Sequence, residues 1–102
     1  MIPLPPDVRE VFLYKKPISM GWGPARLSKL CIEEMEVNPK EGGAFLFFNK
    51  SQDRLKIFFC DSDGDQTIEK KLLKGSFLLP TSADSRPFIK ISAKSLPTLF
   101  RS

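Results

Sequence analysis

Residues 45–80 read FLFFNKSQDRLKIFFCDSDGDQTIEKKLLKGSFLLP, and this stretch decides the fold. It contains two apolar runs separated by a charged turn, followed by an acidic turn and a segment rich in lysine. Apolar and aromatic runs bounded by turn residues are typical of β-strands. The stretch therefore predicts a hydrophobic sheet that also carries exposed cations.

The two apolar runs predict a hairpin. Ala44–Phe48 has no polar residue, which indicates a strand buried on both faces. Residues 49–53 connect it to Arg54–Cys60, where Leu55, Ile57 and Phe59 alternate with Lys56, Phe58 and Cys60 at the period of a strand. The Asp and Gly residues of 61–65 predict a turn, because these residues readily adopt the backbone conformations that turns require.

The segments after the acidic turn are less regular. Thr67–Leu73 fits either a helix or a strand, and both remain open. Ser76–Leu79 is expected to pair as a short strand, and residues 80–87 to form a loop. Phe88–Ile91 predicts a further strand, and Ser92 is placed to cap a short C-terminal helix within residues 93–100.

The first 40 residues predict one strand and one helix. Residues 1–7 hold three prolines and are expected to form an extended arm, followed by a strand at Val8–Tyr14. A helix is expected to begin at Pro24, since proline suits the first helical turn, and to end at Asn38-Pro39. Its buried face follows the helical spacing i, i+3, i+4 and contains Leu27, Leu30, Cys31 and Met35.

These elements predict a small α+β fold in which residues 1–102 form a single domain. We expect an antiparallel sheet of about four or five strands, with the helix packed on one face and the short helix at the C-terminal end. The N-terminal sequence lacks the basic start and apolar stretch of a signal peptide, and the two cysteines are far apart. A cytoplasmic protein without a disulfide is the natural interpretation.

The residue types disfavour most catalytic chemistry. The chain has no histidine, which removes the commonest general base and all His-ligated metal sites. Asp61, Asp63 and Asp65 resemble the start of a calcium-binding loop, but Gln66 replaces its glycine and Leu72 its bidentate glutamate. We interpret these carboxylates as turn-forming residues and expect no enzyme activity, no metal and no cofactor. A metal-dependent nuclease that uses them is the least favoured alternative.

The basic residues are the better candidates for a functional surface. The net charge is +4, and residues 51–102 carry nine Lys/Arg against six Asp/Glu. Such an excess favours contact with polyanions, while the simpler interpretation is a solvated polar face. If the cations of the hairpin and of the lysine-rich segment share a face, they form a stripe able to follow phosphates: Lys50, Arg54, Lys56, Lys70, Lys71 and Lys74.

The same stretch resembles a known family. Members read Phe-x-Phe, then a turn ending Asp-Arg-x-Lys-Ile/Leu, which matches Phe45, Phe47, Asp53-Arg54 and Lys56-Ile57. An acidic Asp-Gly-Asp-Gly turn and a Lys-Arg-Leu-x-x-Gly-x-Phe stretch follow in the family, and residues 61–64 and 70–77 match them in order. The chain is similar to the accessory protein of the bacterial insertion-sequence 66 family, the product of its second open reading frame.

The resemblance extends over most of residues 2–100, with some departures. The family's Asp-Met-Arg-Lys-Gly loop corresponds to residues 19–23, where Ser19 and Gly21 replace the Asp and the Arg. Both motif tryptophans are also replaced, by Cys60 and Leu79. The chain is thus similar to a divergent member.

The resemblance implies a non-enzymatic accessory role in transposition, through contact with DNA, with the transposase or with both. The alternative is a protein–protein interaction module without nucleic-acid binding, in which an exposed phenylalanine-rich surface makes the contact. No membrane contact is expected, and the sequence leaves the oligomeric state open.

Overall fold

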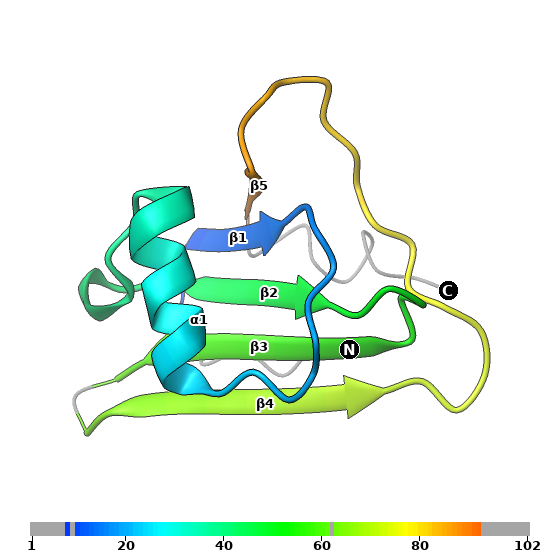
Figure 1. Cartoon of the computed structure of the whole chain (residues 1–102), viewed down its shortest axis with the longest axis horizontal. Helices are drawn as coiled ribbons and strands as arrows, with labels where there is room; N and C mark the ends of the chain where they lie inside the picture. The colour runs from blue at the N-terminus through cyan, green and yellow to red at the C-terminus, as the bar shows by residue number, and fades with distance from the viewer. Residues whose placement is uncertain (1–7, 9, 62, 93–102) are drawn as a thin grey trace.

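Strand β2 (Ala44–Phe48) lies at the centre of the sheet because none of its side chains requires water. All five of its residues are buried. In the computed structural model, which describes residues 8, 10–61 and 63–92, the strand order is β4-β3-β2-β1-β5, and a helical segment crosses one face of the sheet (Figure 1). The expected small α+β fold, with a sheet of about four or five strands and a helix packed on one face, is confirmed, and the sheet has five strands.

The strands and the helix described by the structure were all expected from the sequence, except that no strand forms between β4 and β5. Before β2 come β1 (Glu10–Tyr14), α1 (Pro24–Leu30), the π-helical turn η1 (Cys31–Met35) and the 3₁₀ turn η2 (Pro39–Glu41). After β2 come β3 (Arg54–Cys60), β4 (Asp65–Lys71) and β5 (Phe88–Ser92). The helical segment therefore continues to Met35, and Glu36 ends it in the left-handed conformation with φ of 57°.

The sheet is mixed rather than purely antiparallel. Strand β1 pairs with β2 in parallel, with Phe12 beside Phe45, while the other three strand pairs are antiparallel. The cause is the long connection between the two strands. It runs through α1 and returns the chain to the end of the sheet at which β1 began, so that β2 runs in the same direction.

The helix covers a row of aromatic rings. The four residues that the helical spacing predicted to be buried, Leu27, Leu30, Cys31 and Met35, are all buried. Under them, the stacked rings of Phe12 and Phe45 have centroids 5.2 Å apart, and Phe58 continues the row 6.3 Å from Phe45. Phe88 meets Phe12 edge to face, so the aromatic row joins β5, β1, β2 and β3.

The opposite face of the sheet has its own apolar cluster, which includes Leu13, Leu46 and Ile57. The connection between β4 and β5 contributes Phe77, whose ring packs edge to face on Phe48 at 5.2 Å. The prediction of a strand at Ser76–Leu79 is wrong, because these residues form no ladder. Instead, the N–H of Phe77 donates to the carbonyl of Gln52 at 2.7 Å, which anchors the connection on the β2–β3 hairpin.

The segment that fitted either a helix or a strand, Thr67–Leu73, is an edge strand over most of its length. Its residues alternate between the two faces of the sheet, with Ile68 and Leu72 against the second apolar cluster and Thr67 and Glu69 on the helix side. The pairing with β3 thus decides a pattern that was ambiguous locally.

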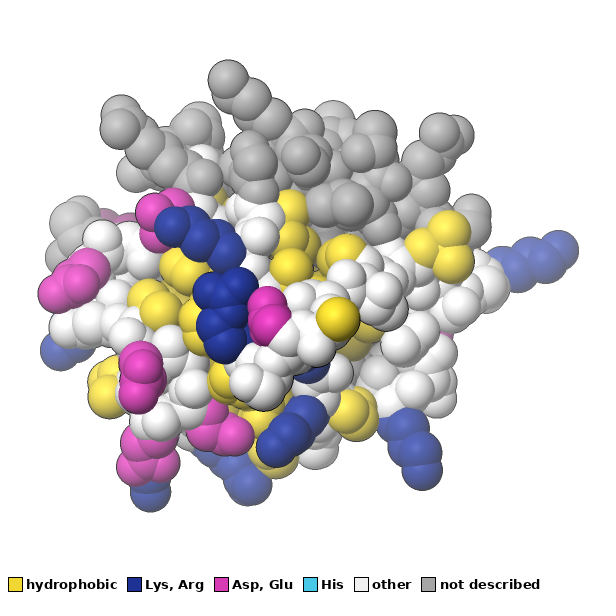
Figure 2. Space-filling view, turned by 90° about the horizontal axis from the view of Figure 1, so that it is seen from above, with side chains coloured by type: hydrophobic (Ala, Val, Ile, Leu, Met, Phe, Trp, Pro, Cys, Tyr) yellow, Lys and Arg dark blue, Asp and Glu magenta, His cyan; other side chains and the backbone are white. Residues whose placement is uncertain are grey.

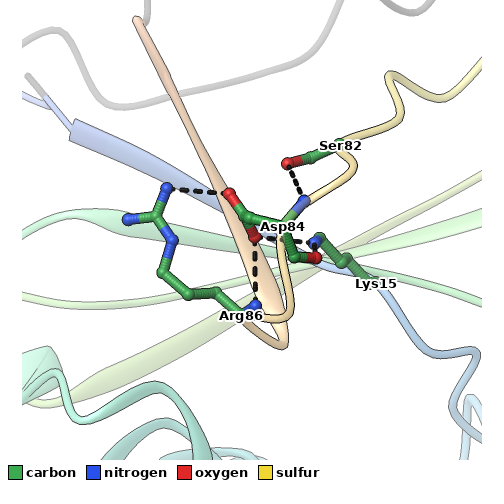
Figure 3. A network of polar contacts seen from close by, with 4 residues as sticks. All are labelled: Lys15, Ser82, Asp84 and Arg86. Atoms are coloured by element: carbon green, nitrogen blue, oxygen red, sulfur yellow. Dashed lines mark hydrogen bonds and ion pairs between the residues drawn. The ribbon is translucent and has the colours of Figure 1, made fainter.

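Asp84 fastens the long connection before β5 to the end of β1 (Figure 3). Its carboxylate accepts from the guanidinium of Arg86 at 3.0 Å and from the ammonium of Lys15 at 3.1 Å. The Lys15 ammonium also donates to the Asp84 carbonyl at 2.9 Å. The hydrogen bond from Arg86 is the largest cause that holds the pKa of Asp84 well below its usual value, and the bond from Lys15 is the next largest.

The remaining predictions concern the ends of the chain. The extended arm at residues 1–7 and the C-terminal helix within residues 93–100 lie outside the described residues. Among the described residues, no helix is long and apolar enough to cross a membrane.

Tyr14 provides a direct test of the packing between sheet and helix. It is the single tyrosine of the chain, its side chain is buried, and its hydroxyl donates to Glu34 at 3.0 Å. Burial, and next the hydrogen bond to Glu34, raise the pKa of Tyr14 from 10.0 to about 12. The neutral phenol is the form that the fold favours. Its contribution to stability is therefore complete below pH 10 and is lost as the pH rises to about 12.

We expect the absorbance at 295 nm to titrate with a midpoint near pH 12 in the folded protein, and near pH 10 in the urea-unfolded protein. Glu34→Gln removes the negative charge and should lower the folded midpoint while leaving part of the shift, because burial is the larger cause. Circular dichroism at each pH checks that the chain is still folded. A folded midpoint near pH 10 would contradict the described packing.

Candidate nucleic-acid interface

Three of the predicted contact residues meet at the end of the sheet where β2 turns into β3. Lys50 lies exposed in the hairpin turn, and Arg54 is the first residue of β3. Arg54 is directly opposite Lys71, the last residue of β4, and both are exposed. Asp53 lies beside them, and its pKa is lowered first by the hydrogen bond from Asn49 and further by the charges of Lys71 and Arg54.

Lys74 belongs to the same end of the sheet. It is exposed and follows β4 by three residues. Two backbone bonds flank it: the N–H of Leu72 donates to the carbonyl of Asp53 at 2.8 Å, and the N–H of Phe77 donates to Gln52. The lysine-rich segment is therefore tied to the hairpin that carries Lys50.

The structure adds a cation that the sequence reasoning missed. Because β1 and β2 are parallel, both end at this side of the sheet, and Lys16 comes just after β1. Lys16 and Lys50 line the same small cavity of about 70 Å³. Lys16 is 70% exposed and lies 4.0 Å from Glu34. The Lys15-Lys16 doublet after a predicted strand is the sequence feature that could have indicated this cation, but only the parallel pairing of β1 with β2 shows that it lies at the same end of the sheet as the hairpin.

We call these five exposed cations the basic end of the sheet: Lys16, Lys50, Arg54, Lys71 and Lys74. The other end is acidic. It carries Glu41 beside Lys40 in η2, and Asp61 and Asp63 in the β3–β4 turn. Asp65, predicted to form part of the turn, is instead the first residue of β4 and pairs with Cys60. Seen from above, most acidic side chains in view gather in the left half of the molecule, the side of η1 and of the β3–β4 turn in Figure 1 (Figure 2). Lys and Arg side chains lie in both halves of the same view, so it is the acidic side chains that are concentrated toward one end of the strands (Figure 2).

Lys56 does not belong to this surface. Only 7% of the residue is exposed, and its ammonium has three oxygen partners inside the protein. It donates to the carbonyl of Met20 at 2.6 Å and to that of Trp22 at 2.9 Å, and it pairs with Glu69 at 3.2 Å. Since an ammonium has three protons, none remains for a phosphate. Lys56 instead fixes the loop before α1 onto the sheet.

Lys70 lies on the other face of the sheet from Arg54 and Lys71. It pairs with Leu55, whose side chain belongs to the second apolar cluster, and it is half-buried. The structure thus brings together four of the six cations predicted from the sequence and places Lys56 and Lys70 elsewhere.

The acidic turn has a structural task. The carboxylate of Asp61 accepts from the N–H groups of Asp63 at 2.8 Å and Gly64 at 3.0 Å, and from the side-chain amide of Gln66. The first of these bonds is the largest cause that lowers the pKa of Asp61. Within the described part of the chain, no three His, Cys, Asp or Glu side chains are grouped to hold a metal ion. These bonds support the interpretation of Asp61 as a turn-forming residue.

The two thiols are not activated nucleophiles. Burial raises the pKa of Cys31 to about 12, and burial followed by the nearby Asp65 raises that of Cys60 to about 11. The Cys60 thiol donates to Asp65 at 2.9 Å. Both cysteines are unbridged and behave as small apolar residues.

The phenylalanine-rich surface of the alternative hypothesis, a protein–protein interaction module, is not present among the described residues, because the rings lie in the core. Seven of the nine phenylalanines are buried: Phe12, Phe45, Phe47, Phe48, Phe58, Phe59 and Phe77. Phe88 is half-buried, and Phe100 is not described. The large apolar side chains that are exposed are instead Ile32, Leu73 and Leu78. Leu78 borders a cavity of about 500 Å³ whose apolar lining includes Leu13 and Leu79.

Replacing Lys56 by alanine should destabilise the protein. The change leaves two loop carbonyls and Glu69 without their shared partner, at a cost of about 2–4 kcal/mol in the free energy of unfolding. Lys50→Ala, in the exposed turn, removes the same type of side chain and should stay within about 0.5 kcal/mol of wild type. Urea unfolding measures both. Equal stability of the two variants would show that the internal contacts of Lys56 are energetically neutral.

Comparison with known proteins places the chain in a family. A search of curated proteins returned no match, and a search of solved structures likewise returned none. The family model of the IS66 Orf2-like proteins matches residues 9–102, which include the whole sheet, the helix and all five cations of the basic end. The chain belongs to the IS66 Orf2-like family.

Proposed function

We propose that this chain is a non-enzymatic accessory protein of IS66 transposition that binds the phosphate backbone of DNA through its basic end. The family implies the accessory role. The observation that carries the DNA contact is the convergence of cations from three separate parts of the chain: Lys16 after β1, Lys50 and Arg54 in the hairpin, and Lys71 and Lys74 around the end of β4.

The form of the basic end favours phosphates over base edges. Four of its five cations are lysines, which act on phosphates as flexible point charges. They lie at a strand end and in turns, and none projects from the helix in a row that would enter a groove. The contact is therefore independent of DNA sequence, and its affinity falls as the salt concentration rises.

The acidic side of the molecule orients the complex. Glu41 and the carboxylates of the β3–β4 turn lie at the other end of the strands and are repelled by the DNA backbone. Bound DNA would then contact the hairpin end alone, which leaves the acidic end and the exposed side of α1 available for a protein partner.

Charge reversal tests the DNA contact. In a mobility-shift assay with duplex DNA at low salt, Lys50→Glu/Lys74→Glu should weaken binding by about tenfold or more, because two phosphate contacts become repulsive. The slope of log affinity against log salt should fall in magnitude by about 2. The matched control is Lys29→Glu/Lys40→Glu, which changes the net charge equally at exposed positions of α1 and η2.

Two outcomes would overturn this proposal. The first is absence of DNA retention by the wild-type protein at low salt. The second is equal weakening by the Lys50/Lys74 pair and by the control pair, which would mean that net charge alone is responsible.

A protein contact is the second candidate function, and the cavity beside Leu78 favours it. Leu78 is 61% exposed and borders the cavity of about 500 Å³ between the β4–β5 connection and the end of β1. If the transposase of the same element docks there, Leu78→Asp should abolish co-purification of the two proteins. Unchanged co-purification would exclude this cavity as the contact.

A further inference from the structure

Strand β4 leaves one edge of the sheet open. It is the last strand on its side, and no described segment lies beyond it (Figure 1). Its pairing with β3 is continuous over seven residues, from Lys71 opposite Arg54 to Asp65 opposite Cys60, without a bulge. A long, regular edge strand of this kind presents a row of backbone groups that pair readily with another strand.

Two hydrogen bonds show which backbone groups point outward. At one end of the ladder the N–H of Asp61 donates to the carbonyl of Gly64, and at the other end the N–H of Leu72 donates to Asp53. Hydrogen-bonded and non-hydrogen-bonded residue pairs alternate along an antiparallel ladder, so either bond is enough to assign each residue of β4 to the inward or the outward set, and the two assignments agree. Gln66, Ile68 and Lys70 direct their backbone groups toward β3, and the outward-facing residues are Asp65, Thr67, Glu69 and Lys71.

We propose that β4 pairs antiparallel with β4 of a second copy of this chain, about a two-fold axis at Ile68. This register places Asp65 opposite Lys71 of the second copy and Thr67 opposite Glu69. Every outward-facing residue thus meets another one, so the backbone N–H and C=O groups of each pair bond to each other. Ile68 meets its own copy in the centre, and the two five-stranded sheets form one continuous sheet.

The charges select this register over its neighbours. An axis at Thr67 would place Asp65 opposite Glu69, and an axis at Glu69 would place that carboxylate opposite itself. A shift of the pairing by one residue would place outward-facing groups against inward-facing ones and form no ladder. The axis at Ile68 sets opposite charges against each other at both ends of the strand, twice in the symmetric pair, and it pairs all seven residues of β4. An axis at Lys70 would also set Glu69 opposite Lys71, but it would pair only residues 69–71 of β4 and place Lys70 against its own copy.

The charge asymmetry of the whole molecule supports the same pairing. In the antiparallel arrangement the acidic β3–β4 turn of each copy lies beside the basic end of the other, with Asp61 and Asp63 near Lys74. The edge also has exposed apolar area near its end, since Leu73, two residues after β4, is fully exposed. Lysine on an edge strand usually prevents pairing, but here Asp65 of the second copy neutralises Lys71.

A charge-swap series measured without DNA tests the interface and its register. In sedimentation velocity, the wild-type sedimentation coefficient should rise with protein concentration toward that of a dimer. Asp65→Lys and Lys71→Asp should each remain monomeric, because like charges then face each other. The double variant Asp65→Lys/Lys71→Asp should recover the dimer. Lys29→Glu, at an exposed position of α1 outside the edge, should behave as wild type.

The outcomes are decisive in both directions. A wild-type protein that is monomeric at every concentration overturns the proposal, as does a dimer that the single charge reversals do not affect. Since Asp65 also accepts the Cys60 thiol hydrogen, circular dichroism of each variant confirms that the fold is intact. The experiment contains no nucleic acid, so failure of the proposed DNA contact would not change its result.

Disulfide cross-linking tests the symmetry axis separately. In a Cys60→Ser background, Ile68→Cys should form a covalent dimer on mild oxidation, because residues opposite each other in a non-hydrogen-bonded pair lie about 4.5 Å apart between Cα atoms. Gln66→Cys is the matched control. It lies on the same face of the same strand but faces Lys70 of the second copy, and should not cross-link. Equal yields from the two variants, or no product from Ile68→Cys, would overturn the two-fold axis.

Discussion

The rest of the structure depends on the complete burial of β2. Its five side chains carry no polar atom, so each face of the strand must be covered by something apolar. On one side, the aromatic row and the helix exclude water, and on the other, the second cluster does so with the help of Phe77. A strand without a polar face has to lie at the middle of a sheet, and here it has two strands on either side. The position of β2 places the β2–β3 hairpin, and with it the basic end.

A single buried ammonium holds the helix side together. Lys56 lies on the face of β3 that the helix covers, and it bonds to carbonyls of the loop that leads into α1. This loop contains Trp22, over whose ring the guanidinium of Arg26 stacks at 3.8 Å. A charge among apolar side chains is tolerated only because oxygen atoms satisfy it on every side. The start of the helix is thereby fixed by a polar contact, while apolar packing holds its buried face on the sheet.

The sequence predicted what local pattern determines. The unbroken apolar run gave β2, the alternation gave β3, and the helical spacing identified the four buried residues of the helical segment. Three features depend on partners distant in sequence and were not predictable from local pattern. The parallel pairing of β1 and β2 brings Lys16 to the basic end. The loop carbonyls that bury Lys56 lie 34 and 36 residues before it. The carbonyl of Gln52 in the hairpin accepts a hydrogen bond from the N–H of Phe77, and Ser76–Leu79 therefore packs on the hairpin and does not pair as a strand.

The pairing of β5 has a consequence for the order in which the chain folds. Strands β2, β3 and β4 are neighbours in sequence as well as in space, so their contacts close short loops and form early. Strand β1 is different, because its partner on one side is β2 and on the other is β5, with Glu10 beside Ser92. During synthesis, β5 is the last of the five described strands to leave the ribosome. Until then the edge of β1 that later pairs with β5 stays open, and the nascent chain exposes a sheet edge that the finished protein covers.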